Sequence, residues 1–285
     1  MHKKDHEKFA LRAMKIGSIV ATISCACMLV TAHSSAVVVS EEQPTKFAMM
    51  EGMYEDEVPP LYAIGWVDEA NEQVIAPFAI PGGTSFLATG NWDTEYQGLN
   101  SLAETEDYSA IDPETMPVNL VFQSYHLMVA MFGLMALTLL LALIFTFKGG
   151  SIKKMRWLQW LIIISPIFAV LAIQSGWATA EFGRQPWVVY PSVTGPEGVE
   201  LLTADGISLA VSGWELIATI VLFVLIYLVL FIAWARIVAR FIKQGPTQEQ
   251  PAPVAASSNS FMSGTPPAKA ADASSNDETA PAATK

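Results

Sequence analysis

The sequence has few charged residues, and this scarcity is the first guide to its class. Only 15% of its 285 residues are Asp, Glu, Lys or Arg, against about 25% in a typical soluble domain. The hydrophobic fraction is 52%, which is typical of a membrane protein and excludes a chain that is disordered throughout. The net charge is −11, so we expect no nucleic-acid partner, because binding to phosphates needs clustered Lys and Arg.

Cysteines and the common motifs of soluble enzymes are also missing. The two cysteines, Cys25 and Cys27, lie close together in an apolar run and cannot form a disulfide framework or a zinc site. The sequence has no Gly-rich phosphate loop, no HExxH, no CxxC and no nucleophile elbow. Candidate functional residues are therefore polar groups at membrane depth, where they are costly and suggest function.

Four long apolar stretches predict transmembrane helices, because each contains the roughly 20 residues needed to cross the hydrocarbon layer. We place them at 16–40, 118–147, 157–182 and 216–243. The first stretch is less apolar than the others. Its basic start and its small residues Ala32-His33-Ser34-Ser35-Ala36 are also typical of a signal peptide, so cleavage near residue 37 stays an alternative.

The connections between these stretches differ in charge. Segments 1–15 and 148–156 and the end of the fourth stretch are basic, whereas segment 41–117 has 16 acidic residues and a single basic one, Lys46. Because cytoplasmic loops are enriched in Lys and Arg, both termini are predicted to be cytoplasmic. The acidic 41–117 loop and the 183–215 connection then face outward.

The predicted fold class is an all-α integral membrane protein with about four transmembrane helices. The large outward-facing loop is rich in aromatic residues, which favours an ordered cap on the membrane surface. Residues 247–285 are rich in Ala, Pro, Ser and Thr and predict a disordered cytoplasmic tail.

A first group of candidate residues lies at the outer end of the third stretch. Trp177, Glu181 and Arg184 recur at i, i+4 and i+7, which places them on one helix face. One interpretation is a site at which a carboxylate, a guanidinium group and an indole face an anionic cofactor. The other is an interfacial aromatic belt with one ion pair.

Two further groups are weaker when taken alone. Met128 has a thioether of the kind that ligates heme iron in some cytochromes, although a methionine in an apolar helix usually serves packing. His126 lies about 200° around the helix from Met128, so the two cannot bind one metal from the same side. Lys46 and Glu51 are either functional or a solvated surface pair.

Taken together and in order, these groups resemble subunit I of the cytochrome bd quinol oxidases. The similar motifs are Glu181-Phe-Gly-Arg-Gln-Pro-Trp187 with the preceding Gly176-Trp177, then Thr45-Lys46-Phe-Ala-Met-Met-Glu51, and His126-Leu-Met128-Val. The resemblance covers about residues 7–246. It corresponds to the C-terminal part of the family, from about its sixth helix onward.

The resemblance implies roles for these residues. Met128 would be an axial ligand of the low-spin heme b, and Lys46 and Glu51 would bind quinol. The Glu181, Arg184 and Trp177 side chains would lie near the high-spin heme b and heme d. The implied protein is a multi-pass respiratory-chain enzyme of a bacterial or archaeal cell (inner) membrane. It would oxidise quinol at the outer face and pass electrons through hemes to reduce oxygen to water.

The chain departs from the family pattern in two ways. His126 stands where the family usually has Arg, so the charge beside the heme would depend on pH. The earlier helices, which carry the histidine ligands, are not matched. The chain is then a fragment, one half of a split subunit, or a paralogue. The implied partners are a polypeptide with the N-terminal helices of subunit I, subunit II, quinol and membrane lipid. The alternative function is a non-catalytic quinone- or heme-binding membrane subunit.

Overall fold

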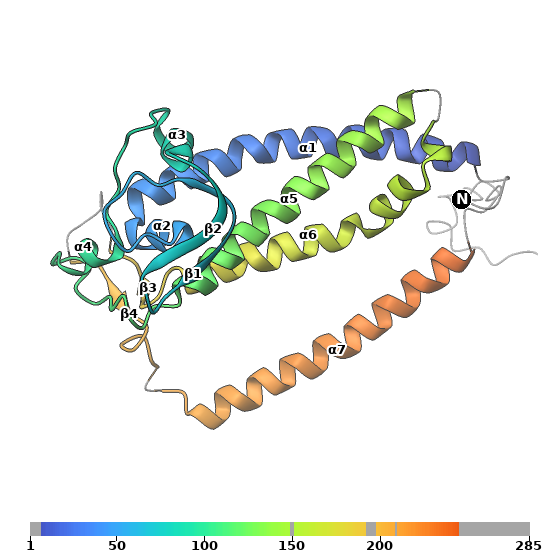
Figure 1. Cartoon of the computed structure of the whole chain (residues 1–285). Coiled ribbons are helices and arrows are strands. Elements are labelled where there is room, and N and C mark those ends of the chain that lie inside the picture. The colour runs from blue at the N-terminus through green and yellow to red at the C-terminus, as the bar shows by residue number, and fades with distance from the viewer. Residues whose placement is uncertain (1–6, 149–150, 192–197, 209, 245–285) are drawn as a thin grey trace, which may run out of the picture. The chain divides into compact units, whose positions relative to one another are not determined.

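The structure is a computed structural model that describes residues 7–148, 151–191, 198–208 and 210–244. It is mostly helical, and four helices are long and apolar enough to cross a membrane (Figure 1). They are α1 (Glu7–Glu42), α5 (Val118–Phe147), α6 (Arg156–Phe182) and α7 (Gly213–Gln244). The predicted class of a helical membrane protein is confirmed. The predicted disordered tail lies outside the described residues.

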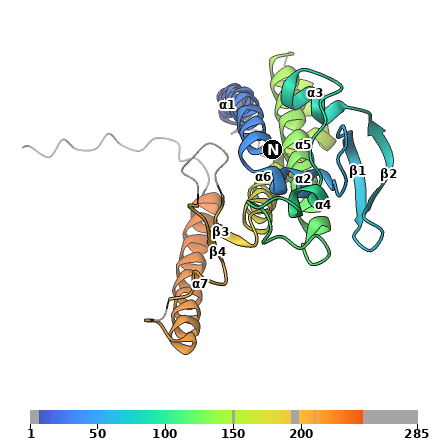
Figure 2. The same cartoon turned by 90° about the vertical axis from the view of Figure 1, so that its left-hand side faces the viewer.

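The helices α1, α5 and α6 pack together, with α5 in contact with both of the others (Figures 1 and 2). A buried hydrogen bond joins α5 to α6, with 2.9 Å between the hydroxyl oxygens of Ser124 and Thr179. An ion pair between Glu7 and Lys153 joins the start of α1 to the short helix η2 (Ser151–Lys154). The N-terminal end of α1 and the connection between α5 and α6 therefore lie at the same end of the three helices.

Two of these helices are longer than a membrane span requires. The 36 residues of α1 and the 30 residues of α5 correspond to about 54 Å and 45 Å at 1.5 Å per residue. The hydrocarbon core of a bilayer is only about 30 Å thick. The first turns of α5 can therefore project from the bilayer and support the loop that precedes it.

That loop folds into an ordered cap, as the aromatic content predicts. It contains α2 (Pro44–Glu51), β1 (Leu61–Asp68), β2 (Gln73–Ile80), α3 (Gly83–Thr89) and α4 (Leu99–Ala103). The strands pair antiparallel, with Leu61 opposite Ile80 and Asp68 opposite Gln73. This hairpin is an addition to the all-helical prediction. The cap has its own hydrophobic core, which α2 and the first turns of α5 share and which includes Phe47, Met49, Met53, Leu99, Leu102 and Phe122.

The connection after α6 also belongs to the cap. Its strands β3 (Trp187–Val189) and β4 (Leu201–Leu202) pair antiparallel. The side chain of Trp187 is completely buried in the core of the cap. The 41–117 loop and the connection after α6 therefore share one hydrophobic core around α2.

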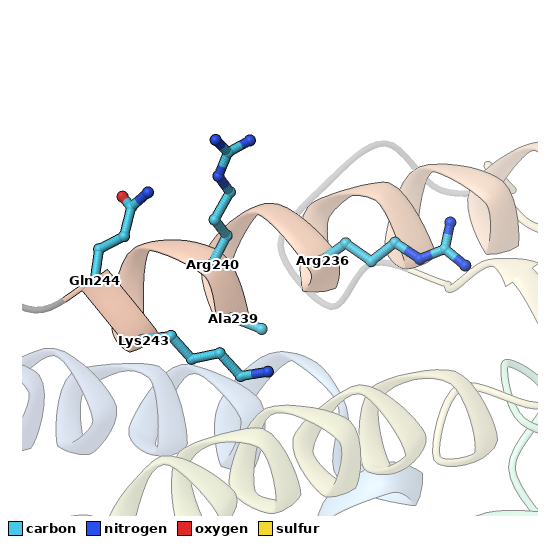
Figure 3. Close-up of a pocket in the computed structure, with 5 residues that line it drawn as sticks. All are labelled: Arg236, Ala239, Arg240, Lys243 and Gln244. Carbon is cyan, nitrogen blue, oxygen red and sulfur yellow. The ribbon is translucent and has the colours of Figure 1, made fainter.

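Most of α7 lies in a second unit that begins at Thr219, and this helix is described by itself. Its first turn is capped by Glu215, whose Oε2 accepts hydrogen bonds from the Ser212 amide at 3.0 Å and the Ser212 hydroxyl at 2.8 Å. At its other end Arg236, Ala239, Arg240, Lys243 and Gln244 line a shallow hollow (Figure 3). The three cations form the basic cluster from which the orientation of this helix is predicted.

Candidate functional site

Lys46 lies on the first turn of α2 and faces the C-terminal end of α6. Its Nζ donates a hydrogen bond to Gln43 Oε1 at 3.1 Å. Burial lowers the pKa of Lys46 below its usual value, the positive charge of Arg184 adds to this effect, and Glu181 opposes it. The structure therefore brings together two groups of residues that are far apart in the sequence, the Lys46 segment and the Glu181–Arg184 motif.

A glycine allows this close approach. A β-carbon added at Gly183 would lie 2.9 Å from Lys46 Cγ, which is too close for an ordinary contact. Gly183 follows directly after α6, which ends at Phe182. The absence of a side chain at this position lets the stem of Lys46 lie against the end of α6.

Glu181 and Arg184 form an ion pair, with 2.5 Å between Glu181 Oε2 and Arg184 Nη2. The sequence spacing suggested that Arg184 shares a helix face with Trp177 and Glu181. Because α6 ends at Phe182, Arg184 instead lies beyond the helix. The two side chains are 42% and 39% exposed. A pair this exposed stabilises a fold by only about 0–1 kcal/mol, so its place beside Lys46 is more informative than its contribution to stability.

Glu51, at the last turn of α2, is buried inside the cap with only 2% of its surface exposed. Burial raises the pKa of Glu51 to about 8, which the hydrogen bond from Thr84 opposes and the charge of Glu57 reinforces. The carboxyl group is therefore mainly protonated at pH 7.

The hydroxyl group of Thr84 has two acceptors within reach. Thr84 Oγ1 lies 3.2 Å from Glu51 Oε2 and 3.1 Å from the Pro60 carbonyl oxygen. A hydroxyl group has one proton to donate. Thr84 donates to Glu51 or to the Pro60 carbonyl, and its bond to Glu51 is the one that opposes the rise in the pKa of Glu51.

Aromatic side chains that the sequence analysis did not single out lie near Glu51. Burial and the charges of Glu57 and Glu51 raise the pKa of Tyr62 to about 12. The Tyr62 ring lies 5.9 Å from the ring of Phe122, and Tyr125 is within electrostatic reach of Glu51. No local sequence signal marks these residues, because they come from β1 and α5 and meet only in the folded cap.

His126 belongs to the same aromatic group. Its Nδ1 lies 2.8 Å from the Phe122 carbonyl oxygen, and its ring stacks on Phe122 with 4.0 Å between the ring centroids. The ring also contacts Tyr125 edge-on. These contacts hold the imidazole in the aromatic cluster.

Met128 lies farther along α5 at the interface with α6. A β-carbon added at Gly176 would be only 2.7 Å from Met128 Sδ, so the sulfur occupies the space that this glycine leaves. Met128 is suited to hold one axial position of a heme iron. Among the described residues no histidine faces it, because His126 is held as above and His33 is exposed on α1. That Met128 ligates a heme stays a prediction.

The remaining predicted residue, Trp177, lies on the outside of α6, with 64% of its surface exposed. It does not contribute to the group around Lys46. Lys46 and Glu51 are also apart: they lie on different sides of α2, with Lys46 against Gly183 and Glu51 beside Thr84.

The fold and these groups define a multi-pass membrane protein with an extramembrane cap that carries titratable residues. The family described as cytochrome bd terminal oxidase subunit I matches residues 1–246. The chain belongs to this family.

Individual relatives agree with this assignment. The chain is 27% identical over 262 residues to the cytochrome bd ubiquinol oxidase subunit 1 of Bacillus subtilis (strain 168), covering 91% of this chain and 54% of that protein. It is 26% identical over 300 residues to the cytochrome bd-II ubiquinol oxidase subunit 1 of Escherichia coli (strain K12), covering 85% and 56%.

A solved structure is also similar. The bd oxidase from Geobacillus thermodenitrificans matches with a TM-score of 0.62 and 28% identity, over 85% of this chain and 50% of that chain. The chain thus spans about half the length of the relatives it matches.

Proposed function

We propose that this chain forms the C-terminal part, from about the sixth helix onward, of subunit I in a cytochrome bd-type quinol:oxygen oxidoreductase. Quinol is oxidised in the cap, at the outer face of the membrane. The observation that carries this proposal is the contact of Lys46, the single basic residue of the acidic loop, with Gly183, which lies between the paired Glu181 and Arg184 at the end of α6. Family membership supports it.

The two quinol residues have different roles in this proposal. Lys46 donates a hydrogen bond to a quinol oxygen, for which its ammonium group is suited. Glu51 accepts and releases a proton, because a carboxyl group with a pKa of about 8 is close to the working pH and can exchange protons in both directions. Their positions on different sides of α2 fit a division between substrate binding and proton transfer.

The cofactors of this proposal are the low-spin heme b, the high-spin heme b and heme d, which carry electrons from quinol to oxygen when bound. Met128 would ligate the low-spin heme b, and His126 would lie near it. Glu181 and Trp177 on α6, and Arg184 just beyond it, would lie near the high-spin hemes. The exposure of Trp177 leaves it available for such a contact.

The proposed partners supply what the described residues lack. A polypeptide with the N-terminal helices of subunit I provides the histidine opposite Met128 and most of the oxygen site, and subunit II completes the oxidase. The complex lies in the bacterial or archaeal cell (inner) membrane. Both termini of this chain are cytoplasmic, and the cap faces outward.

The proposal is tested by Lys46→Ala in the complex purified through this chain. We expect quinol turnover to fall at least about tenfold while the heme absorbance stays intact, because a positioned proton donor contributes on the order of 100-fold or more. Lys154→Ala, in η2 at the opposite end of the helices, is the matched control. Full quinol turnover in Lys46→Ala with intact hemes would refute the proposed role of Lys46, whereas a wild-type complex without quinol turnover would refute the proposed function and favour a non-catalytic quinone- or heme-binding subunit.

A further inference from the structure

The N-terminus of α2 has no cap from its own neighbourhood. The first amides of a helix lack partners within the helix and need other acceptors. The residue before α2 is Gln43, and its side chain makes no capping hydrogen bond. The Thr45 amide instead donates to the hydroxyl of Tyr190 at 3.2 Å, over a separation of 145 residues. The Thr45 Oγ1 also lies 2.7 Å from the Tyr190 hydroxyl oxygen.

The Tyr190 ring is held firmly by other aromatic side chains. It lies edge-on to Trp187 with 5.1 Å between ring centroids, and 5.9 Å from Tyr108. Trp187 itself has no exposed surface. Because both neighbours belong to the core of the cap, the Tyr190 hydroxyl has a fixed position from which to bind α2.

Tyr190 makes one of two contacts between a single short segment and the first turn of α2. At one end of this segment Gly183 lies against the stem of Lys46, and Arg184 acts on the charge of the same side chain. At the other end Tyr190 binds Thr45. Lys46 directly follows Thr45, so a loss of order in this turn would displace the lysine from Arg184.

We propose that Tyr190 is a positioning residue for quinol oxidation: its hydroxyl caps α2 through Thr45 and thereby holds Lys46 against Gly183 at the end of α6. This inference rests on the proposed function, since it assigns a support to the lysine that binds quinol. Tyr190 does not itself contact the substrate. Its effect on turnover is therefore expected mainly as weaker quinol binding and not as a loss of hemes.

The test uses Tyr190→Phe in the assembled oxidase, because phenylalanine keeps the ring and removes only the hydroxyl group. Hydrogen exchange in the first turn of α2 should become about five- to tenfold faster, and the KM for quinol should rise several-fold with unchanged heme absorbance. Thr45→Val removes the shorter hydrogen bond from the other side and should act in the same direction. The double variant should be no worse than Tyr190→Phe alone, since Tyr190→Phe already removes the hydrogen bond that Thr45→Val removes.

Tyr96→Phe is the matched control, because its ring lies 4.8 Å from Phe47 on the same helix and is not part of the Tyr190 contact. If Tyr190→Phe fails to assemble, Thr45→Val measures the same interaction. Unchanged exchange in α2, or an unchanged KM in a complex where Lys46→Ala has lost turnover, would overturn the positioning role. Faster exchange in α2 of Tyr190→Phe together with full turnover of Lys46→Ala would show that Tyr190 holds the first turn of α2 and that the proposed role of Lys46 in quinol oxidation is wrong.

Discussion

Replacing Glu51 with glutamine should change how the stability of the cap depends on pH. In the folded cap Glu51 is fully buried and its pKa is raised from 4.5 to about 8, mainly by burial. Glutamine has nearly the same shape as a protonated glutamic acid and can make the same contacts with Thr84. It has no proton to lose in this range. Glu51→Gln therefore removes the titration while keeping the packing.

The sign of the effect follows from where the proton is bound. Between pH 4.5 and about 8 the folded cap holds a proton that the unfolded chain releases, so the stability of the wild type falls as the pH rises through this window. Below pH 4.5 both states are protonated and the loss disappears. A shift of this size corresponds to up to about 5 kcal/mol above pH 8, at 1.36 kcal/mol for each pH unit.

Thermal unfolding of the assembled complex between pH 5 and 9 measures this effect. We expect the midpoint of Glu51→Gln to exceed that of the wild type at pH 8 and the difference to shrink toward pH 5. Glu106→Gln, which changes an exposed carboxylate of the same cap, should leave the wild-type pH dependence unaltered. Parallel pH profiles for the wild type and Glu51→Gln would refute the argument that the burial of Glu51 raises its pKa.

Three further predictions concern topology and the heme sites. Reporter fusions after residues 100 and 244 should report opposite sides of the membrane, and the same side for both would contradict the orientation. Gly176→Ala should reduce low-spin heme absorbance in the complex, because the added β-carbon would lie 2.7 Å from Met128 Sδ. Gly133→Ala is the control, because a β-carbon there meets nothing within 4 Å. Equal absorbance in both variants would argue against Met128 as a heme ligand. Glu181→Gln should change stability by only about 1 kcal/mol or less but alter high-spin heme spectra, and unchanged spectra would leave the ion pair as an interfacial feature.

The four membrane-crossing helices are the part of the fold that the sequence predicts best. An apolar run without charge that is as long as a bilayer is thick strongly favours a membrane-spanning helix. The ends of the helices are harder to predict from the sequence. For example, α1 begins at Glu7, nine residues before the predicted span. Hydropathy marks the part of a helix within the hydrocarbon layer, whereas the helix itself continues into water, where Lys8, Arg12 and Lys15 are tolerated.

The hairpin in the cap shows where local patterns are too weak. The segments of β1 and β2 contain β-branched and aromatic residues, but Gly65 and Pro77 interrupt them. Both residues disfavour the interior of a strand. A proline is tolerated at an edge, and in a sheet of two strands each strand is an edge. That Pro77 is compatible with a strand here can be recognised only when its partner strand is known.

The candidate site illustrates a different limit, because its residues are known from their motifs but their neighbours are not. Lys46 and Glu51 are separated by five residues on one helix, which places their side chains about 140° apart. Helix geometry alone therefore argues that Lys46 and Glu51 do not contact the same neighbouring group. What it cannot supply is the identity of the residues on either side of α2. The end of α6 faces Lys46 because Gly183 leaves room for it, and Thr84 faces Glu51 because the hairpin brings α3 back over α2. Both arrangements depend on contacts between distant segments, and these contacts give the two residues their different pKa shifts.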